Sequence, residues 1–255
     1  MNNQCPAMDE LKDIMDRLLA PDGCPWDREQ THESLLRYLI EESYEVVEAV
    51  KEEDMSKLQE ELGDLLLQVV FHAALAEREG FFNLDDVART VSTKMINRHP
   101  HVFGSLELKT SGDVLDHWEG FKQKEGKKQL LSGIPTMLPA LLRALKLQEK
   151  AARVGFDWPT IDGAIDKFAE EVAELKDAET PVEIKEELGD LFFALVNVAR
   201  MKDVEPEDAL QGCNNKFSRR FNYIEDCVAR SGRKIEELPL EELDALWDEA
   251  KARGL

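Results

Sequence analysis

Apolar residues recur every three to four positions along most of this chain, which is the spacing of helices that bury one face. The segments with this pattern span residues 9–19, 35–50, 58–76, 84–96, 114–123, 138–152, 161–175, 184–201, 209–228 and 240–252. The alternation typical of strands is almost absent. Thr180 to Glu183 also forms a complete capping box, with Pro181 at the first helical position. The predicted fold class is all-α.

The same landmarks occur twice in the same order, which indicates a duplicated helical unit. The matching pairs are residues 23–27 with 155–159, 41–45 with 170–174, 60–66 with 186–192, and 94–98 with 216–220. The gaps between them differ by only a few residues. We therefore predict an N-terminal helical domain over residues 1–126, a linker over 127–136, and a C-terminal helical domain over 137–255.

Two acidic motifs in each copy have the spacing of a metal site. Side chains three or four positions apart share one face of a helix, so Glu42 with Glu45 and Glu61 with Asp64 converge if their helices pack antiparallel. The corresponding acids of the second copy are Glu171, Glu174, Glu187 and Asp190. Grouped carboxylates need a cation, and oxygen ligands without His or Cys favour Mg²⁺, Mn²⁺ or Ca²⁺ over zinc.

An isolated acidic run in a chain with 53 Asp and Glu residues is more often a solvated helix face. However, Glu61 and Asp64 lead directly into the apolar run 65–71, and both copies keep the acids. Gly63 and Gly189 lie between the paired acids, although glycine costs a helix about 1 kcal/mol relative to alanine. We expect a helix backbone or a ligand to approach closely there.

The formal net charge of −21 argues against nucleic acid and anionic membranes as partners. A polyphosphate ligand would therefore need bound cations and a local group of Lys and Arg. The scattered Cys5, Cys24, Cys213 and Cys227 form no C-x-x-C pair, and the first residues contain no apolar leader segment. The longest apolar stretch, 65–75, is too short to span a membrane. We expect a reducing, cytoplasmic setting.

The combined motifs resemble the MazG family. E-E-x-x-E is followed by E-L-G-D, with GCPWD ahead at 23–27 and RHPHVF behind at 98–103. The resemblance covers nearly the whole chain and implies tandem helical bundles of the all-α NTP pyrophosphatase type. It also implies a Mg²⁺-dependent, homodimeric hydrolase that converts a nucleoside triphosphate such as ATP to the monophosphate and diphosphate. By the motif, the four acids of each half match the metal ligands of the family.

Hydrolysis between the α- and β-phosphates needs an activated water and neutralised phosphate charge, which bound metal ions provide. Glu170 or Glu171 is our candidate for the general base. The candidate substrate-binding residues are Lys167, Lys185, Asn197, Lys216, Arg219, Arg220 and Trp247 in the second half, and Lys94 and Arg98 in the first. The Lys216–Arg220 spacing matches phosphate-binding positions of the family. For Lys216, Arg219 and Arg220 the alternative is a solvated basic turn of the helix. For Trp247 the alternative is a tryptophan that packs in the core or in a dimer contact.

The two halves are not equivalent. The first has Asn97 where the second has Arg219, and Phe71 where the second has Asn197. We therefore predict that the second half is the better catalyst. Few candidate residues are placed to contact the base, which favours broad base specificity. The sequence is compatible with two physiological roles, nucleotide-pool cleansing and degradation of a signalling nucleotide.

Two other functions compete with this interpretation. A di-iron bundle requires Glu-x-x-His on each of two helices, and only Glu29 to His32 fits. A non-catalytic dimerisation scaffold or metal buffer explains the acids but not the Lys and Arg residues that follow them. For His99 and His101 we expect a turn that packs Phe103. Trp26 and Trp158 are expected to be core anchors.

Overall fold

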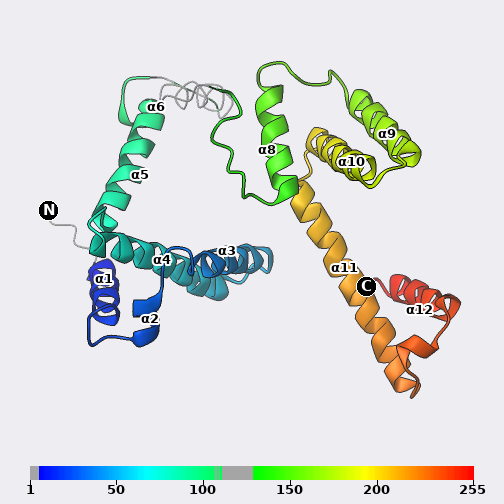
Figure 1. The fold of residues 1–255 in the computed structure, drawn as a ribbon, viewed down its shortest axis with the longest axis horizontal. Helices are drawn as coiled ribbons and strands as arrows, with labels where there is room; N and C mark the ends of the chain where they lie inside the picture. The colour runs from blue at the N-terminus through cyan, green and yellow to red at the C-terminus, as the bar shows by residue number, and fades with distance from the viewer. Residues whose placement is uncertain (1–5, 107, 109, 111–128) are drawn as a thin grey trace. The chain divides into compact units, whose positions relative to one another are not determined.

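The computed structural model describes residues 6–106, 108, 110 and 129–255, and all regular elements among them are helices (Figure 1). The helices are α1 (Pro6–Leu18), α2 (Pro25–Glu29), α3 (Leu36–Lys51), α4 (Met55–Arg78), α5 (Leu84–Arg98), α6 (Pro100–Phe103), α8 (Ala140–Ala152), α9 (Ile161–Asp177), α10 (Pro181–Met201), α11 (Pro206–Arg230) and α12 (Leu240–Ala252), with a 3₁₀ turn at Ile235–Glu237. The all-α prediction is confirmed.

The helical periodicity located the long elements well. Nine of the ten predicted segments correspond to helices, and the tenth, 114–123, lies outside the described residues. The short helices α2 and α6 were not predicted, because helices of 5 and 4 residues are too short for an apolar periodicity to show. Pro25 and Pro100 occupy first-turn positions, where the missing N–H is not needed.

The chain divides into two compact units, Met1–Lys122 and Gln123–Leu255. The predicted linker at 127–136 begins in residues outside the described part, and its exact extent stays a prediction. The first unit is built on a hairpin of α3 and α4, which lie side by side, with α1 and α5 also packed on α4 (Figure 1). Its core consists of Met15, Leu19, Leu35, Val70, Phe71, Ala74 and Leu75.

The turn between α3 and α4 fixes the register of the first hairpin. Asp54 caps α4 by accepting hydrogen bonds from the backbone N–H groups of Ser56 and Lys57 at 2.9 and 3.0 Å. Glu53, just before it, has a left-handed backbone with a φ of 55°. A three-residue connection of this kind brings the facing sides of α3 and α4 together along their length.

The second unit contains the matching hairpin of α9 and α10. The predicted capping box is confirmed, since the Thr180 hydroxyl accepts from the Glu183 N–H and the Glu183 carboxylate accepts from the Thr180 N–H. Helix α8 packs on α10 and α11, and α12 packs on α11 (Figure 1). Buried apolar residues of this unit are Leu145, Ala164, Ala194, Val196, Ile224, Val228 and Ala250.

Three expectations about large side chains are wrong within these units. Trp26 and Trp158 are 50% and 44% exposed, so neither is a buried anchor. His99 and His101 do belong to a short turn of helix, but Phe103 is 62% exposed rather than packed. Trp26 and Phe103 belong to the short helices α2 and α6, and Trp158 lies in the connection before α9, so none of them is on a helix of the α3–α4 or α9–α10 hairpins. No helix in the described part of the chain has the length and apolar character needed to span a membrane.

Candidate functional site

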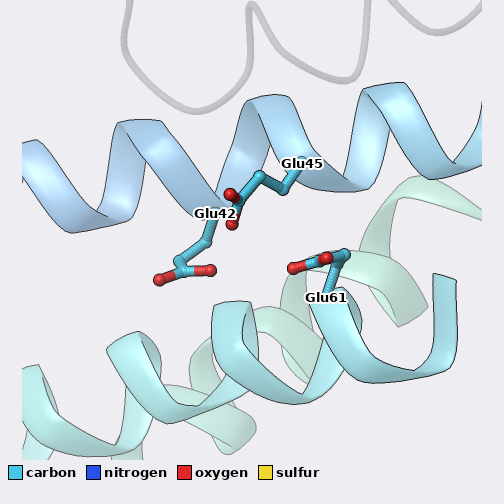
Figure 2. A group of neighbouring side chains, drawn as sticks. All are labelled: Glu42, Glu45 and Glu61. Atoms are coloured by element: carbon cyan, nitrogen blue, oxygen red, sulfur yellow. The ribbon is translucent and has the colours of Figure 1, made fainter. Parts of the chain in front are cut away.

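The acids of the first hairpin converge as predicted. Figure 2 shows Glu42 and Glu45 reaching from α3 and Glu61 reaching from α4 toward one another. One carboxylate oxygen from each lies within 4.8 Å of the others, and all three side chains are half-buried. The predicted fourth member, Asp64, is outside this closest group, but its charge acts on Glu42.

Burial and mutual repulsion act in the same direction on this cluster. The pKa of Glu42 is raised, first by burial and then by the charges of Asp64 and Glu45. The pKa of Glu61 is raised as well, again first by burial and then by Glu45. Each group therefore holds a proton more readily than an isolated carboxyl. A divalent cation relieves the same repulsion, so the donor set fits a hard metal ion.

The second hairpin also groups three acids, but they are not the three that correspond to the group of the first hairpin. Glu171 from α9 and Glu187 and Asp190 from α10 each place an oxygen within 4.8 Å of the others. Glu171 is only 4% exposed, and a carboxylate is rarely so buried unless it is paired. Glu174 lies outside the closest group but is hydrogen-bonded to Glu171. Its pKa is raised, mainly by burial.

Each half thus brings three of its four predicted acids into one group. Two of the three occupy corresponding positions in the two halves, since Glu42 corresponds to Glu171 and Glu61 to Glu187. The remaining member is Glu45 in the first half and Asp190 in the second. Because Asp64 and Glu174 act electrostatically on their own clusters, all eight predicted acids lie at the two sites.

A lysine distinguishes the second cluster. The Lys167 ammonium is 2.7 Å from Glu171 Oε1 and 2.8 Å from Glu170 Oε1, and these bonds raise the pKa of Lys167. Lys167 therefore lies at the site, as does the proposed base Glu170. The first half has Tyr38 at the equivalent position, four residues before Glu42.

Lys57 is a cation of the first site that the sequence reasoning missed. It binds Glu48 at 2.8 Å and Glu52 at 2.9 Å, and its charge offsets a small part of the rise in the pKa of Glu61 that burial and the neighbouring acids cause. Its position four residues before Glu61 on α4 was an available signal. The charge balance of the two sites therefore differs, because Lys57 binds acids outside its cluster and Lys167 binds a member of its own.

The predicted phosphate-binding residues of α11 do not contact the acids of their unit in the described part of the chain. Lys216 and Arg219 are exposed on the helix surface. The Arg220 side chain donates through Nε to the Leu255 carbonyl at 2.7 Å and lies over the Trp247 ring. Trp247 also packs on Phe217, with ring centroids 5.2 Å apart. Trp247 thus contributes to the α11–α12 contact.

The remaining candidates lie on two helices. Lys185 is exposed in the second turn of α10, Lys94 is exposed on α5, and Arg98 is half-buried at the end of α5. None of the ion pairs found among the described residues joins these three to a carboxylate cluster. Their assignment to substrate stays a prediction.

Asn197 has neighbours that the sequence reasoning did not identify. Its Oδ1 accepts hydrogen bonds from Arg200, and the Arg200 guanidinium forms a bidentate pair with Asp157. The signal available was the three-residue spacing of Asn197 and Arg200 on α10, which puts both on one face. The contact with Asp157 joins residues 43 positions apart and required the fold.

Gly63 and Gly189 are not packed within their own units. Apart from its chain neighbours and the backbone of its own helix turns, a Cβ atom at either position would meet no atom within 4 Å. The expectation of close helix approach is therefore wrong inside each unit. The approach of a ligand at these positions stays a prediction.

The two carboxylate hairpins coincide with the segments that match a known domain. The MazG nucleotide pyrophosphohydrolase domain matches residues 30–103 and 163–224, which contain α3, α4, α10 and all of α9 except its first two residues. The chain belongs to the MazG family. This confirms the resemblance and the duplicated helical fold, and the chain is a hydrolase acting on acid anhydrides.

Relatives of known sequence cover nearly the whole chain. The nucleoside triphosphate pyrophosphohydrolase/pyrophosphatase MazG of Thermotoga maritima is 48% identical over 95% of this chain and 95% of its own length. The nucleoside triphosphate pyrophosphohydrolase of Escherichia coli K12 is 43% identical over 97% of this chain and 98% of its own. A crystal structure of a mazG-related protein from Thermotoga maritima matches 45% of this chain and 98% of its own, with 32% identity and a TM-score of 0.40.

Proposed function

We propose that this MazG chain hydrolyses nucleoside triphosphates to nucleoside monophosphates and diphosphate, with Mg²⁺ held by the second carboxylate cluster. Mn²⁺ is the expected substitute, because it shares the preference for oxygen ligands. The observation that carries the proposal is the buried Glu171 carboxylate, grouped with Glu187 and Asp190 on the facing helix. Lys167 balances only part of the charge of these three carboxylates, so a divalent cation would stabilise the group further.

The residues of the second site have distinct roles in this proposal. Glu171, Glu174, Glu187 and Asp190 hold the metal, which when bound neutralises phosphate charge and lowers the pKa of a water molecule. Glu170 lies outside the ligand group and is the proposed acceptor of the proton from the attacking water. Lys167 holds Glu170 and Glu171 in place at 2.8 and 2.7 Å.

Cations of the second unit are the groups that receive the triphosphate in this proposal. Lys167 lies at the cluster itself, and Lys216 and Arg219 project from α11 as further phosphate-binding groups. Their exposure leaves them available to a polyanion. The first half retains Glu42, Glu45, Glu61 and Asp64 as a second metal site with Lys94 and Arg98 as its cations, but it has Tyr38 in place of Lys167. We therefore assign most of the turnover to the second half.

A homodimer is the proposed assembly. Four apolar side chains of α3, namely Leu36, Ile40, Tyr44 and Val47, are exposed at spacings of three or four residues and form one stripe. On α10, Leu188, Phe192 and Leu195 form a comparable exposed stripe. Exposed apolar stripes of this length are typical of surfaces that another chain covers. The cytoplasmic setting stays part of the proposal.

One assay tests the activity. The full chain is incubated with a panel of ribo- and deoxyribonucleoside triphosphates, with Mg²⁺, with Mn²⁺ and with chelator, and the products are separated. We expect monophosphate and diphosphate from most bases, in keeping with broad specificity, and no turnover with chelator. Release of orthophosphate, or metal-independent turnover, would contradict the proposal. Including oxidised nucleotides and guanosine polyphosphates in the panel separates nucleotide-pool cleansing from stress-nucleotide control.

A further inference from the structure

Asp157, Asn197 and Arg200 form a polar network in the second unit, separate from the carboxylate cluster. Arg200 Nη1 lies 3.0 Å from Asp157 Oδ2, and Nη2 pairs with Oδ1 of the same carboxylate. Arg200 also donates to Asn197 Oδ1, from Nε at 3.1 Å and from Nη2 at 2.7 Å. The network is well shielded, since the Arg200 side chain is 15% exposed, and the pair lowers the pKa of Asp157.

The network determines which way the Asn197 amide faces. A guanidinium has only donors, so the Asn197 atom that faces Arg200 must be the carbonyl oxygen. The amide nitrogen then points away from Arg200 and presents two N–H donors. No described residue accepts a hydrogen bond from that nitrogen, and it is not enclosed by the protein. Asp157 holds the guanidinium in a bidentate pair, which leaves Arg200 little freedom to release the amide.

The equivalent place in the first unit is apolar. Phe71 and Ala74 occupy the positions that correspond to Asn197 and Arg200, and they are 4% and 7% exposed within the core of that unit. Burying two apolar side chains on a helix face costs less free energy than burying a charged and hydrogen-bonded group there. A polar network in the second unit therefore calls for an explanation beyond stability.

The network lies further along the helix that carries Glu187 and Asp190. Asn197 follows Asp190 by seven residues on α10, which is about 10 Å along the helix axis on the same face. The loop that carries Asp157 is also fixed, because Trp158 packs so closely on Gly163 that an added Cβ would lie 2.7 Å from its ring. Asp157 Oδ1 also accepts a hydrogen bond from the Trp158 N–H at 2.9 Å.

We infer that Arg200 and Asp157 are positioning residues that hold the Asn197 amide donors toward an acceptor atom of the nucleoside part of the substrate. The inference rests on the proposed function, since it takes the phosphates to be bound at the second carboxylate cluster. The first unit, with Phe71 and Ala74 at these places, offers no such donor. Recognition of the nucleoside is therefore a property of the second unit.

The test compares ATP with inorganic triphosphate, which lacks a nucleoside. In Arg200→Met and Asn197→Asp, we expect KM for ATP to rise about 10-fold, the loss of one well-placed hydrogen bond, with kcat nearly unchanged. Inhibition by inorganic triphosphate should keep its wild-type Ki. Asn197→Asp still accepts from Arg200 but has lost the donors, so it tests the donors without breaking the network. Arg200→Lys keeps a cation for Asp157 and serves if Arg200→Met does not fold.

Arg233→Met is the matched control, because Arg233 pairs with Glu242 at 2.7 Å in the same unit, outside the network. It should leave both constants at wild-type values. Unchanged KM in the Arg200 and Asn197 variants, or a parallel rise in the Ki of triphosphate, would overturn the inference and leave the proposed function intact. If the wild type releases no monophosphate, the proposed function fails, and ATP affinity measured by calorimetry decides the inference. Equal affinities of wild type and Arg200→Met would then overturn it.

Discussion

His32 and His72 face each other nitrogen to nitrogen, with their Nδ1 atoms 2.8 Å apart. The ring planes differ by 1°. The ring centroids are 5.1 Å apart, which equals the distance between the two Nδ1 atoms plus the distance from each Nδ1 atom to the centroid of its own ring. The rings are therefore coplanar, and one Nδ1 donates a proton to the other. His72 Nε2 is buried without a partner, which is tolerated better by a bare nitrogen than by an N–H group. His72 thus donates and His32 accepts.

This pair predicts a pH dependence that is confined to the first unit. Burial, and next the charge of His32, lowers the pKa of His72 from its ordinary value of 6.5. As the pH falls through 6.5, the unfolded chain binds a proton that the folded unit resists. The free energy of unfolding is therefore retained above pH 6.5 and decreases below it, by less than about 1.4 kcal/mol per pH unit for this half-buried group.

The corresponding residues of the second half, Ile161 and Val198, supply the matched variant. Urea unfolding of the wild type and of His32→Ile/His72→Val is followed between pH 7.5 and 5.5, with hydrogen exchange used to separate the two units. We expect the double variant to lose the pH slope of the α3–α4 hairpin and to leave that of α9–α10 unchanged. Identical slopes for the two proteins would rule out a role for the pair.

The matched acids Glu174 and Glu45 test which half carries the turnover. Glu174→Gln removes a carboxylate of the proposed catalytic site, and we expect kcat/KM to fall by at least about 100-fold, the upper range for residues that support a metal. Glu45→Gln should retain a substantial fraction of wild-type activity. Steady-state kinetics with saturating Mg²⁺ gives both values. Equal losses would contradict the assignment of turnover to the second half.

Lys167 predicts opposite effects on metal and on substrate. Lys167→Met removes the cation that pairs with Glu171, so the cluster becomes more negative and should bind Mn²⁺ more tightly. The same change removes a phosphate-binding charge, so KM for ATP should rise about 10-fold. Mn²⁺ affinity is measured by paramagnetic resonance. Lys146→Met, which breaks an exposed pair with Glu149 on α8, should change neither quantity. Weaker Mn²⁺ binding in Lys167→Met would show that Lys167 supports the metal site instead of competing with it.

The first cluster predicts a dependence of stability on charge. The folded-state pKa of Glu61 lies above its ordinary value of 4.5, so the folded chain holds more protons than the unfolded chain just above pH 4.5. Stability contributed by this group is therefore lost as the pH rises through that range. At pH 7 with chelator, Glu61→Gln should have a higher Tm than the wild type. Added Mg²⁺ should raise the Tm of the wild type more, because the metal binds only the folded chain.

Glu60→Gln is the control for charge alone, since Glu60 is the exposed neighbour outside the ligand group. It should keep the full Mg²⁺-dependent increase in Tm, as measured by calorimetry. Loss of that increase in Glu60→Gln to the same extent as in Glu61→Gln would mean that only net charge matters. The two variants carry the same formal charge, so the comparison isolates position.

The sequence by itself determined the helices, the duplication and the residues of both acid clusters. These features depend on local spacing: apolar periodicity places the helices, and acids three residues apart share a face regardless of the rest of the chain. The capping residues Thr180 and Glu183 likewise act within one turn. The family followed from the order of these motifs.

Only the tertiary structure decided which acids meet and what else is at each site. The grouping of Glu171 with Glu187 and Asp190 depends on how α9 and α10 pack, and the pairs Asp157–Arg200 and His32–His72 join residues far apart in sequence. Residue spacing along the chain does not predict such pairs, because it does not determine the distance between residues on different elements. For the same reason, the sequence did not reveal that Arg220 contacts the Leu255 carbonyl, or that Gly63 and Gly189 are open within their units.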